Sequence, residues 1–193
     1  MPQPAPAVLD FLQRRRSCPA KMLGLPVPGR EDLMPLLQAA ARSPDHGKLE
    51  PWRFIVLERR ALQRLAALAG ECGHALGLAP EQVEKGVRQY GDAHLAVAVV
   101  ASPRASEKIP QIEQHLSAGA VCLALLNAAL AAGWGGNWLS GFASHDRKFC
   151  EIGLGLAEGE FIAGMIHIGT APAQPVPERP RPDLEKIVQW VAE

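Results

Sequence analysis

Two arginines and a serine stand side by side at Arg15-Arg16-Ser17, at the end of a predicted helix. Guanidinium groups match the oxygens of phosphate and carbonyl groups, and the hydroxyl adds a neutral hydrogen-bonding partner. A basic helix end is also common as a solvated surface that contributes little to stability. Taken alone, the cluster leaves both interpretations open, an anion-binding site and a solvated helix end.

A second polar segment follows another predicted helix. Pro44 and Pro51 restrict a short loop between this helix and a predicted strand. The loop carries five polar side chains, Arg42, Asp45, His46, Lys48 and Glu50. Such a concentration of chemically versatile side chains in one connection is typical of functional loops. Trp52 and Phe54, in the strand that follows, are assigned to the core.

A third candidate is the glycine-rich segment Gly133-Trp134-Gly135-Gly136-Asn137-Trp138-Leu139-Ser140-Gly141. We predict a bend here, because glycine permits turns and the segment follows a long apolar helix. Glycines also let a backbone approach a flat ligand, on which Trp134 and Trp138 would be able to stack. Burial of both tryptophans in the core is an equally good interpretation.

Other catalytic and metal-binding patterns are missing from the sequence. The glycines between residues 153 and 159 do not fit G-x-G-x-x-G, no P-loop is present, and Ser140 lacks the G-x-S-x-G frame. The six histidines form no i, i+4 ligand pair and no H-E-x-x-H pattern. We therefore predict no metal and no catalytic nucleophile. His94 and His167, at strand positions, are assigned structural roles.

Composition and charge narrow the class of protein. Lys and Arg number 20 and balance 20 Asp and Glu residues, which argues against binding to nucleic acid or anionic membranes. The four separated cysteines form no C-x-x-C pair, so neither zinc nor a disulfide framework is expected. The N-terminus lacks a signal-peptide pattern, and the apolar stretch 118–138 is weakly hydrophobic for a membrane span. We expect a cytoplasmic protein.

Hydrophobic periodicity predicts the elements that position these segments. Helices are expected at 8–16, 30–42, 61–68, 80–90 and 110–132, and strands at 53–58, 94–101 and 160–169. The longest helix is apolar almost all round from Ala118 onward, which is typical of a helix buried on every side. We predict one domain over 1–193, with a mobile tail at 1–7 and an extended, proline-rich arm at 172–193. Helices wrapping one central sheet leave the classes α+β and α/β open.

In their order and spacing, these segments resemble the FMN-dependent nitroreductase family, and within it the small NAD(P)H nitroreductases. The resemblance covers about residues 8–170. It is carried by Arg15-Arg16-Ser17, Ala41-Arg42-Ser43-Pro44-Asp45-His46 with Pro51-Trp52-Arg53-Phe54, Ser117-Ala118-Gly119-Ala120, and Gly133-Trp134-Gly135-Gly136 with Trp138 and Ser140. It implies an α+β nitroreductase-like fold, with a mostly antiparallel sheet wrapped by helices and a long buried central helix.

The resemblance also implies a function and a set of site residues. FMN would be held by Arg15, Arg16 and Ser17, with Arg42 and His46 reaching it from the partner subunit or from beside it. Trp138, Leu139 and Ser140 would line the cofactor. The reaction would pass a hydride from NADH or NADPH through the flavin to a nitroaromatic, a quinone or a similar small-molecule acceptor. The expected assembly is a homodimer built around the helix that contains residues 117–132.

Three residues depart from the pattern of the resembling proteins: Lys48, Glu50 and Leu139. They motivate an alternative, a non-catalytic flavin-binding or flavin-handling protein that retains the fold. A third possibility is a helical interaction protein without a cofactor, which would apply if every polar loop were only a solvated surface. Flavin absorbance of the purified protein, followed by oxidation of NADH or NADPH with an added acceptor, would separate the three.

Overall fold

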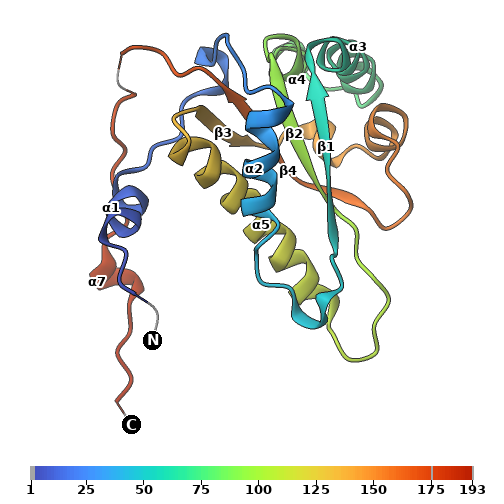
Figure 1. Cartoon of the computed structure of the whole chain (residues 1–193). Helices are drawn as coiled ribbons and strands as arrows, with labels where there is room; N and C mark the ends of the chain where they lie inside the picture. Colours follow the sequence, from blue (N-terminus) through green and yellow to red (C-terminus); the bar gives the residue numbers. More distant parts are fainter. Residues whose placement is uncertain (1–2, 175, 193) are drawn as a thin grey trace.

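A computed structural model describes residues 3–174 and 176–192 of the chain (Figure 1). Its centre is a four-stranded sheet in the order β1-β2-β4-β3, in which all neighbouring strands are antiparallel. The strands are β1 (Trp52–Glu58), β2 (Leu95–Ala101), β3 (Gly135–Leu139) and β4 (Phe161–Gly169). The class is therefore α+β with an antiparallel sheet, which confirms the fold that the resemblance implied.

Helices cover both faces of this sheet (Figure 1). One face packs against α2 (Arg30–Ala40) and α5 (Gln111–Ala131), and the other against α3 (Arg59–Ala75), α4 (Pro80–Gly91) and α6 (Phe142–His145). The alternation of side chains along β2 supplies the two cores: Ala96 and Ala98 belong to one, and Val97 and Val99 to the other. All seven residues of β2 are buried, as expected for a central strand with helices on both sides.

β3 is the element that the sequence did not predict. The glycine-rich segment was expected to bend, but residues 135–139 form an edge strand. Its two glycines serve close packing: a Cβ at Gly135 would lie 2.6 Å from the Leu23 side chain, and one at Gly136 would lie 2.9 Å from Leu126. The turn occurs earlier, at Gly133, whose φ of 86° requires glycine and ends α5 as predicted.

The two ends of the chain lie apart from the three-layer body (Figure 1). Helix α1 (Pro6–Arg14) begins inside the predicted tail and contains no buried residue. The arm after β4 has no regular element until the short α7 (Leu184–Ile187). Both ends expose large apolar side chains, among them Trp190 at 93%. Predicted residues 1, 2 and 193 of the tail and arm lie outside the described residues, as does residue 175.

α5 is the long central helix that was predicted, and it packs on β2, β3 and β4. Its sheet-facing residues are buried, whereas Leu116 is 66% exposed and Leu123 is 45% exposed. Among the described residues, α5 alone is long and apolar enough to span a membrane by length and composition, and 44% of that 18-residue window is buried. A single chain thus leaves one apolar stripe of its central helix uncovered.

Candidate functional site

The Arg15-Arg16-Ser17 cluster lies in an extended segment that is attached to the edge strand β3. Arg15 caps α1 with a ψ of 140°, so the chain leaves the helix two residues before the predicted end. The Cys18 N–H donates to the Gly136 carbonyl at 2.9 Å, and Asn137 Nδ2 donates to the Cys18 carbonyl at 2.7 Å. The sheet thereby fixes a segment that has no regular structure of its own.

Three guanidinium groups converge at this segment. Arg15 Nη2 donates to Ser17 Oγ at 2.9 Å, whereas its Nε is buried without a hydrogen-bond partner. Burial lowers the pKa of Arg15, and the positive charges of Arg181 and Arg16 lower it further. Arg16 Nε donates to the Pro177 carbonyl at 3.1 Å, which ties the C-terminal arm to the cluster. Arg181 is exposed and pairs with Glu178 at 2.9 Å, whereas Arg15 and Arg16 are half-buried and Arg15 keeps a free N–H, a donor set that suits an anion such as phosphate.

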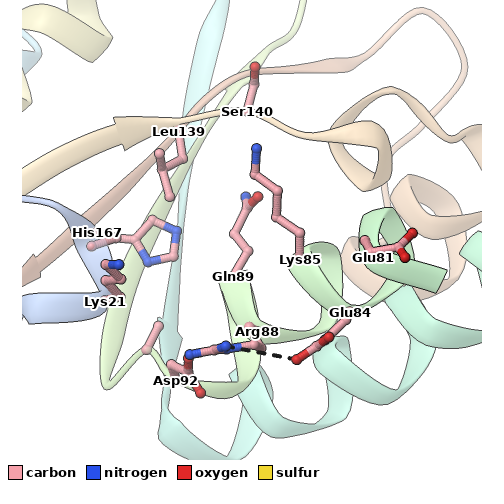
Figure 2. A pocket seen from close by; sticks show the side chains of 12 residues that line it. Lys21, Glu81, Glu84, Lys85, Arg88, Gln89, Asp92, Leu139, Ser140 and His167 are labelled. Carbon is pink, nitrogen blue, oxygen red and sulfur yellow. Dashed lines mark hydrogen bonds and ion pairs between the residues drawn. The ribbon is translucent and has the colours of Figure 1, made fainter. Parts of the chain in front are cut away.

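A cavity of about 520 Å³ opens between α4 and the sheet, and Ala20 and Lys21, which follow the cluster in the chain, are part of its lining (Figure 2). Volumes of this size are typical of sites for small molecules and cofactors. Its lining residues come from the segment after Cys18, from α4, and from β3 and β4: Ala20, Lys21, Glu81, Glu84, Lys85, Arg88, Gln89, Asp92, Ala93, Leu139, Ser140 and His167. The structure thus places two of the predicted cofactor residues, Leu139 and Ser140, in the wall of a cavity.

The third predicted residue of β3, Trp138, lies on the opposite face of the sheet from Leu139. Successive side chains of a strand point to opposite faces. Trp138 covers Gly164 of β4, where a Cβ would lie 2.3 Å from the Trp138 Nε1 atom and 2.9 Å from Cys122 of α5. Trp138 does not line the cavity, and its side is that of α5.

Charged groups at the cavity differ in their pairing. Arg88 is paired with Asp92 at 3.2 Å and with Glu84 at 3.8 Å (Figure 2). Among the described residues, no carboxylate oxygen lies within 4.0 Å of the amino group of Lys21 or Lys85. The cavity therefore has two ammonium groups available for an anionic or electron-rich ligand.

The predicted loop residues Arg42 and His46 lie elsewhere. His46 Nδ1 is 2.7 Å from Glu113 Oε2, on the first turn of α5, and Arg42 is exposed. The Asp45 carboxylate accepts from the backbone N–H groups of Leu49 and Glu50, at 3.2 and 2.8 Å. These bonds hold the loop in one shape on the protein surface.

Within one chain, the two sets of predicted residues are far apart. The loop lies at the N-terminal end of α5, while β3 and the arginine cluster follow its C-terminal end (Figure 1). A helix of 21 residues is roughly 30 Å long at 1.5 Å per residue. The structure places Leu139 and Ser140 in the cavity wall and attaches the segment that carries Arg15, Arg16 and Ser17 to the same strand through Cys18, but it does not bring Arg42 or His46 there.

The site contains residues that the sequence analysis missed. Lys85 and Gln89 were not singled out, although their i, i+4 spacing on a predicted helix places them on one face. Arg181 is far along the chain, in an arm without periodicity, and no local pattern marks it. His167 was assigned a structural role because it lies in a buried strand, yet it lines the cavity.

Other parts of the described chain offer weaker candidates. A second cavity of about 800 Å³, mostly apolar, lies between α2 and β1, and no predicted site residue lines it. No three His, Cys, Asp or Glu side chains of the described residues come together as a metal site. All four cysteines are buried free thiols, and burial raises the pKa of Cys122 to about 12 and that of Cys72 to about 11.

Comparison with known proteins places this chain in a family. The sequence profile described as "Nitroreductase family" matches residues 12–170, and the chain belongs to that family, which is one of oxidoreductases. It is 35% identical over 162 residues to "Putative NAD(P)H nitroreductase YdjA" of Escherichia coli strain K12, covering 84% of this chain and 87% of that protein. It is 34% identical over 163 residues to a protein with the description "Putative NAD(P)H nitroreductase" of Haemophilus influenzae, again with 84% and 87% coverage.

Solved structures share the fold at lower sequence identity. The nitroreductase-like family protein from Bacillus cereus superposes with a TM-score of 0.79 at 20% identity, covering 100% of both chains. A nitroreductase with bound FMN from Bacteroides fragilis superposes with a TM-score of 0.74 at 17% identity, covering 95% of this chain and 98% of that one. The whole three-layer arrangement is therefore that of the nitroreductase fold.

Proposed function

We propose that the protein is a cytoplasmic, FMN-dependent oxidoreductase that passes a hydride from NADH or NADPH through the flavin to a nitroaromatic, a quinone or a similar acceptor. The observation that carries the proposal is that one short segment bears the cationic cluster of Arg15 and Arg16 and then, at Ala20 and Lys21, enters the wall of a cavity that also includes Leu139 and Ser140. A ligand with an anionic tail and a flat ring needs these two features side by side. The curated relatives at 35% and 34% identity are named as nitroreductases that use NAD(P)H.

The residues present fit FMN. The donor set of Arg15 and Ser17 suits a phosphate, and the buried, unpartnered Nε of Arg15 is a donor that a phosphate oxygen would satisfy. Lys21 continues the same segment into the cavity. The cavity wall holds further buried polar atoms without partners, on Gln89 and His167, which a heterocycle would satisfy. Buried polar atoms are normally paired, so these three residues indicate a site for a polar ligand.

The protein's part in the reaction is binding, orientation and electrostatics. Bound FMN would supply the chemistry, by accepting a hydride from the nicotinamide and giving it to the acceptor. Lys21 and Lys85 place positive charge at the cavity, which favours a ligand on which negative charge develops. We place no nucleophile in the site, since the buried cysteines have raised pKa values and are protonated at neutral pH.

We further propose that the working unit is a homodimer in which the flavin site is shared. Arg42 and His46 of the partner subunit would reach the cavity that the first chain leaves without them. Support comes from the exposed apolar stripe of α5, which includes Leu116 and Leu123, and from the exposed apolar side chains of α1 and the arm. A two-fold axis beside α5 would cover the stripe with its own copy and bring the loop end of one chain to the cavity end of the other.

Purification and rapid kinetics test the proposal. The protein should be yellow, or should bind FMN stoichiometrically with quenching of flavin fluorescence. Stopped-flow mixing with NADH or NADPH should bleach the flavin before any acceptor is added, and turnover should follow ping-pong kinetics because both substrates use one flavin. Bound flavin that resists reduction by both nicotinamides would favour the non-catalytic flavin-binding alternative. A wild type that binds no flavin would refute the proposal.

A pair of adjacent arginines provides a matched test of the anion site. Arg15→Met should weaken FMN binding by roughly 10- to 100-fold, since a hydrogen bond to a charged group contributes about 1.5–3 kcal/mol. Arg14→Met is the control, because Arg14 is exposed and pairs with Asp10 one turn earlier. Riboflavin, which lacks the phosphate, should bind wild type and Arg15→Met equally. Equal loss of FMN and riboflavin affinity would place Arg15 away from the phosphate.

A further inference from the structure

Two polar side chains on opposite walls of the cavity have buried atoms without partners. His167 projects from β4 and Gln89 from α4 into the same space (Figure 2). Neither ring nitrogen of His167 has a hydrogen-bond partner, and Gln89 Nε2 has none. His167 is 1% exposed, so bulk water does not satisfy its ring. Unpaired buried polar groups destabilise the fold. A ligand in the cavity that hydrogen-bonds to them would remove this cost.

His167 is an uncharged group in this position. Desolvation by the surrounding residues lowers its pKa to about 4, and no carboxylate holds the ring in a charged form. Its partner across the strand pair, Asn137, is engaged with the Cys18 carbonyl, and Asp92 is engaged with Arg88. A neutral imidazole presents one N–H donor and one nitrogen acceptor.

Gln89 is held in place by the turn after β3. A Cβ at Gly141 would lie 2.8 Å from Gln89 Oε1, so glycine at this position makes room for the amide. Because the oxygen is directed toward Gly141, the amide nitrogen is free on the cavity side. The wall therefore combines two donors and one acceptor, all neutral, while the charged groups of Lys21 and Lys85 lie elsewhere on the lining.

We infer that His167 and Gln89 recognise the uncharged polar edge of the heterocycle in the cavity, where carbonyl oxygens flank a ring N–H, and that His167 determines the specificity for it. The inference rests on the proposed flavin site and deepens it: in FMN this edge is that of the pyrimidinedione ring. One His167 ring nitrogen accepts from its N3–H, and the Gln89 amide donates to a flanking carbonyl oxygen. The anionic tail is left to the arginine cluster.

The test compares FMN with 3-methyl-FMN, which lacks the N3–H, by fluorescence titration of flavin-free protein. Wild type should bind FMN roughly tenfold more tightly than the methylated analogue. His167→Phe keeps a flat ring without nitrogens, and Gln89→Leu keeps the length without the amide. His167→Phe should weaken FMN several-fold and abolish the discrimination, while Gln89→Leu should weaken both flavins several-fold. His167→Gln should restore part of the discrimination, and Met165→Leu, on the same face of β4, is the control.

The stability of the flavin-free protein separates recognition from a structural role. Removing an unpaired buried polar group should leave the melting temperature of His167→Phe unchanged or higher, while its FMN affinity falls. A structural role would lower both. The inference is overturned if wild type binds FMN but both variants keep its affinity and His167→Phe keeps its preference over 3-methyl-FMN. Failure of wild type to bind FMN would instead refute the proposed function. Should His167→Phe not fold, Gln89→Leu and His167→Gln still decide the question.

Discussion

The polar groups near the two ends of α5 differ in their hydrogen bonding. Near its C-terminal end, Arg15, Gln89 and His167 have buried polar atoms without partners. Near its N-terminal end, His115 Nε2 of α5 is buried without a partner, but the groups that anchor the loop are paired, since His46 contacts Glu113 and the Pro44 carbonyl accepts from Ser117. The loop is strained in its backbone instead, because Lys48 and Glu50 have φ values of 54° and 47°, in the left-handed region.

The two ends of α5 therefore suit different roles: the cavity end suits binding of a ligand, and the loop end suits presentation of side chains. Unpaired donors and acceptors around a cavity are satisfied only when something binds, whereas a paired, strained loop is already in its final shape. Strained backbone is found where the surrounding structure fixes a functional geometry. We interpret the cavity end as the binding half of a site and the loop end as the half that is offered to a neighbouring molecule, the second chain in our proposal.

The largest expected effect comes from disrupting the proposed dimer, which would separate the cavity of one chain from the loop of the other. Leu123→Glu places a charge on the exposed stripe of α5, and a dimer would have to bury it without a partner. We expect the dimer dissociation constant to rise roughly 100-fold or more, because an uncompensated buried charge costs about 3 kcal/mol or more. FMN retention should fall in parallel. Analytical ultracentrifugation with detection at flavin wavelengths measures both.

A matched control for this substitution lies on the other side of the sheet. Leu76, which caps the C-terminus of α3, is 52% exposed, and Leu76→Glu should leave assembly and flavin content unchanged. A Leu123→Glu monomer that still carries FMN with wild-type affinity would contradict the shared site, while leaving the flavin chemistry intact. Equal effects of both substitutions would indicate a general loss of stability.

The sequence predicted the body of the fold better than the relation between its two ends. Apolar periodicity located β1, β2, β4 and α5 to within about two residues, because each element buries a regular face. β3 escaped prediction because its glycines, which signal turns, here permit contact with Leu23 and Leu126. Tertiary packing places the polar loop and the arginine cluster at opposite ends of α5, and no local sequence pattern encodes that placement.

An intermediate effect is expected from the ion pair that fastens the loop end of the sheet. Arg53 Nε and Nη2 donate to the two carboxylate oxygens of Glu160, at 2.8 and 2.7 Å, joining β1 to the residue before β4. These hydrogen bonds lower the pKa of Glu160 from 4.5 to about 2. A carboxyl with a depressed pKa contributes stability that is complete above its unfolded value and is lost as pH falls through its folded value.

The difference in stability between wild type and Arg53→Met should therefore depend on pH in a defined direction. The variant should be less stable than wild type at pH 7, and the gap should narrow as pH falls from about 4.5 toward about 2. Denaturant titrations at several pH values measure the gap. Arg14→Met, which breaks the exposed pair with Asp10, should leave stability essentially unchanged at every pH. A gap that is constant with pH would assign the effect of Arg53 to packing.

The smallest effect concerns the strained loop itself, and it has an unusual sign. Lys48→Gly and Glu50→Gly should each stabilise the fold by about 0.5 kcal/mol, since relief of the left-handed backbone, worth about 1–2 kcal/mol, exceeds the entropic cost of glycine. Leu49, between them, has an ordinary φ of −77°, so Leu49→Gly should destabilise. Denaturant midpoints of the three variants give the comparison.

If the loop presents its side chains in a fixed geometry, the stabilised Glu50→Gly variant should still bind FMN less tightly than wild type, because the loop gains freedom around His46. Higher stability with unchanged FMN affinity would mean that the strained backbone does not serve the shared site.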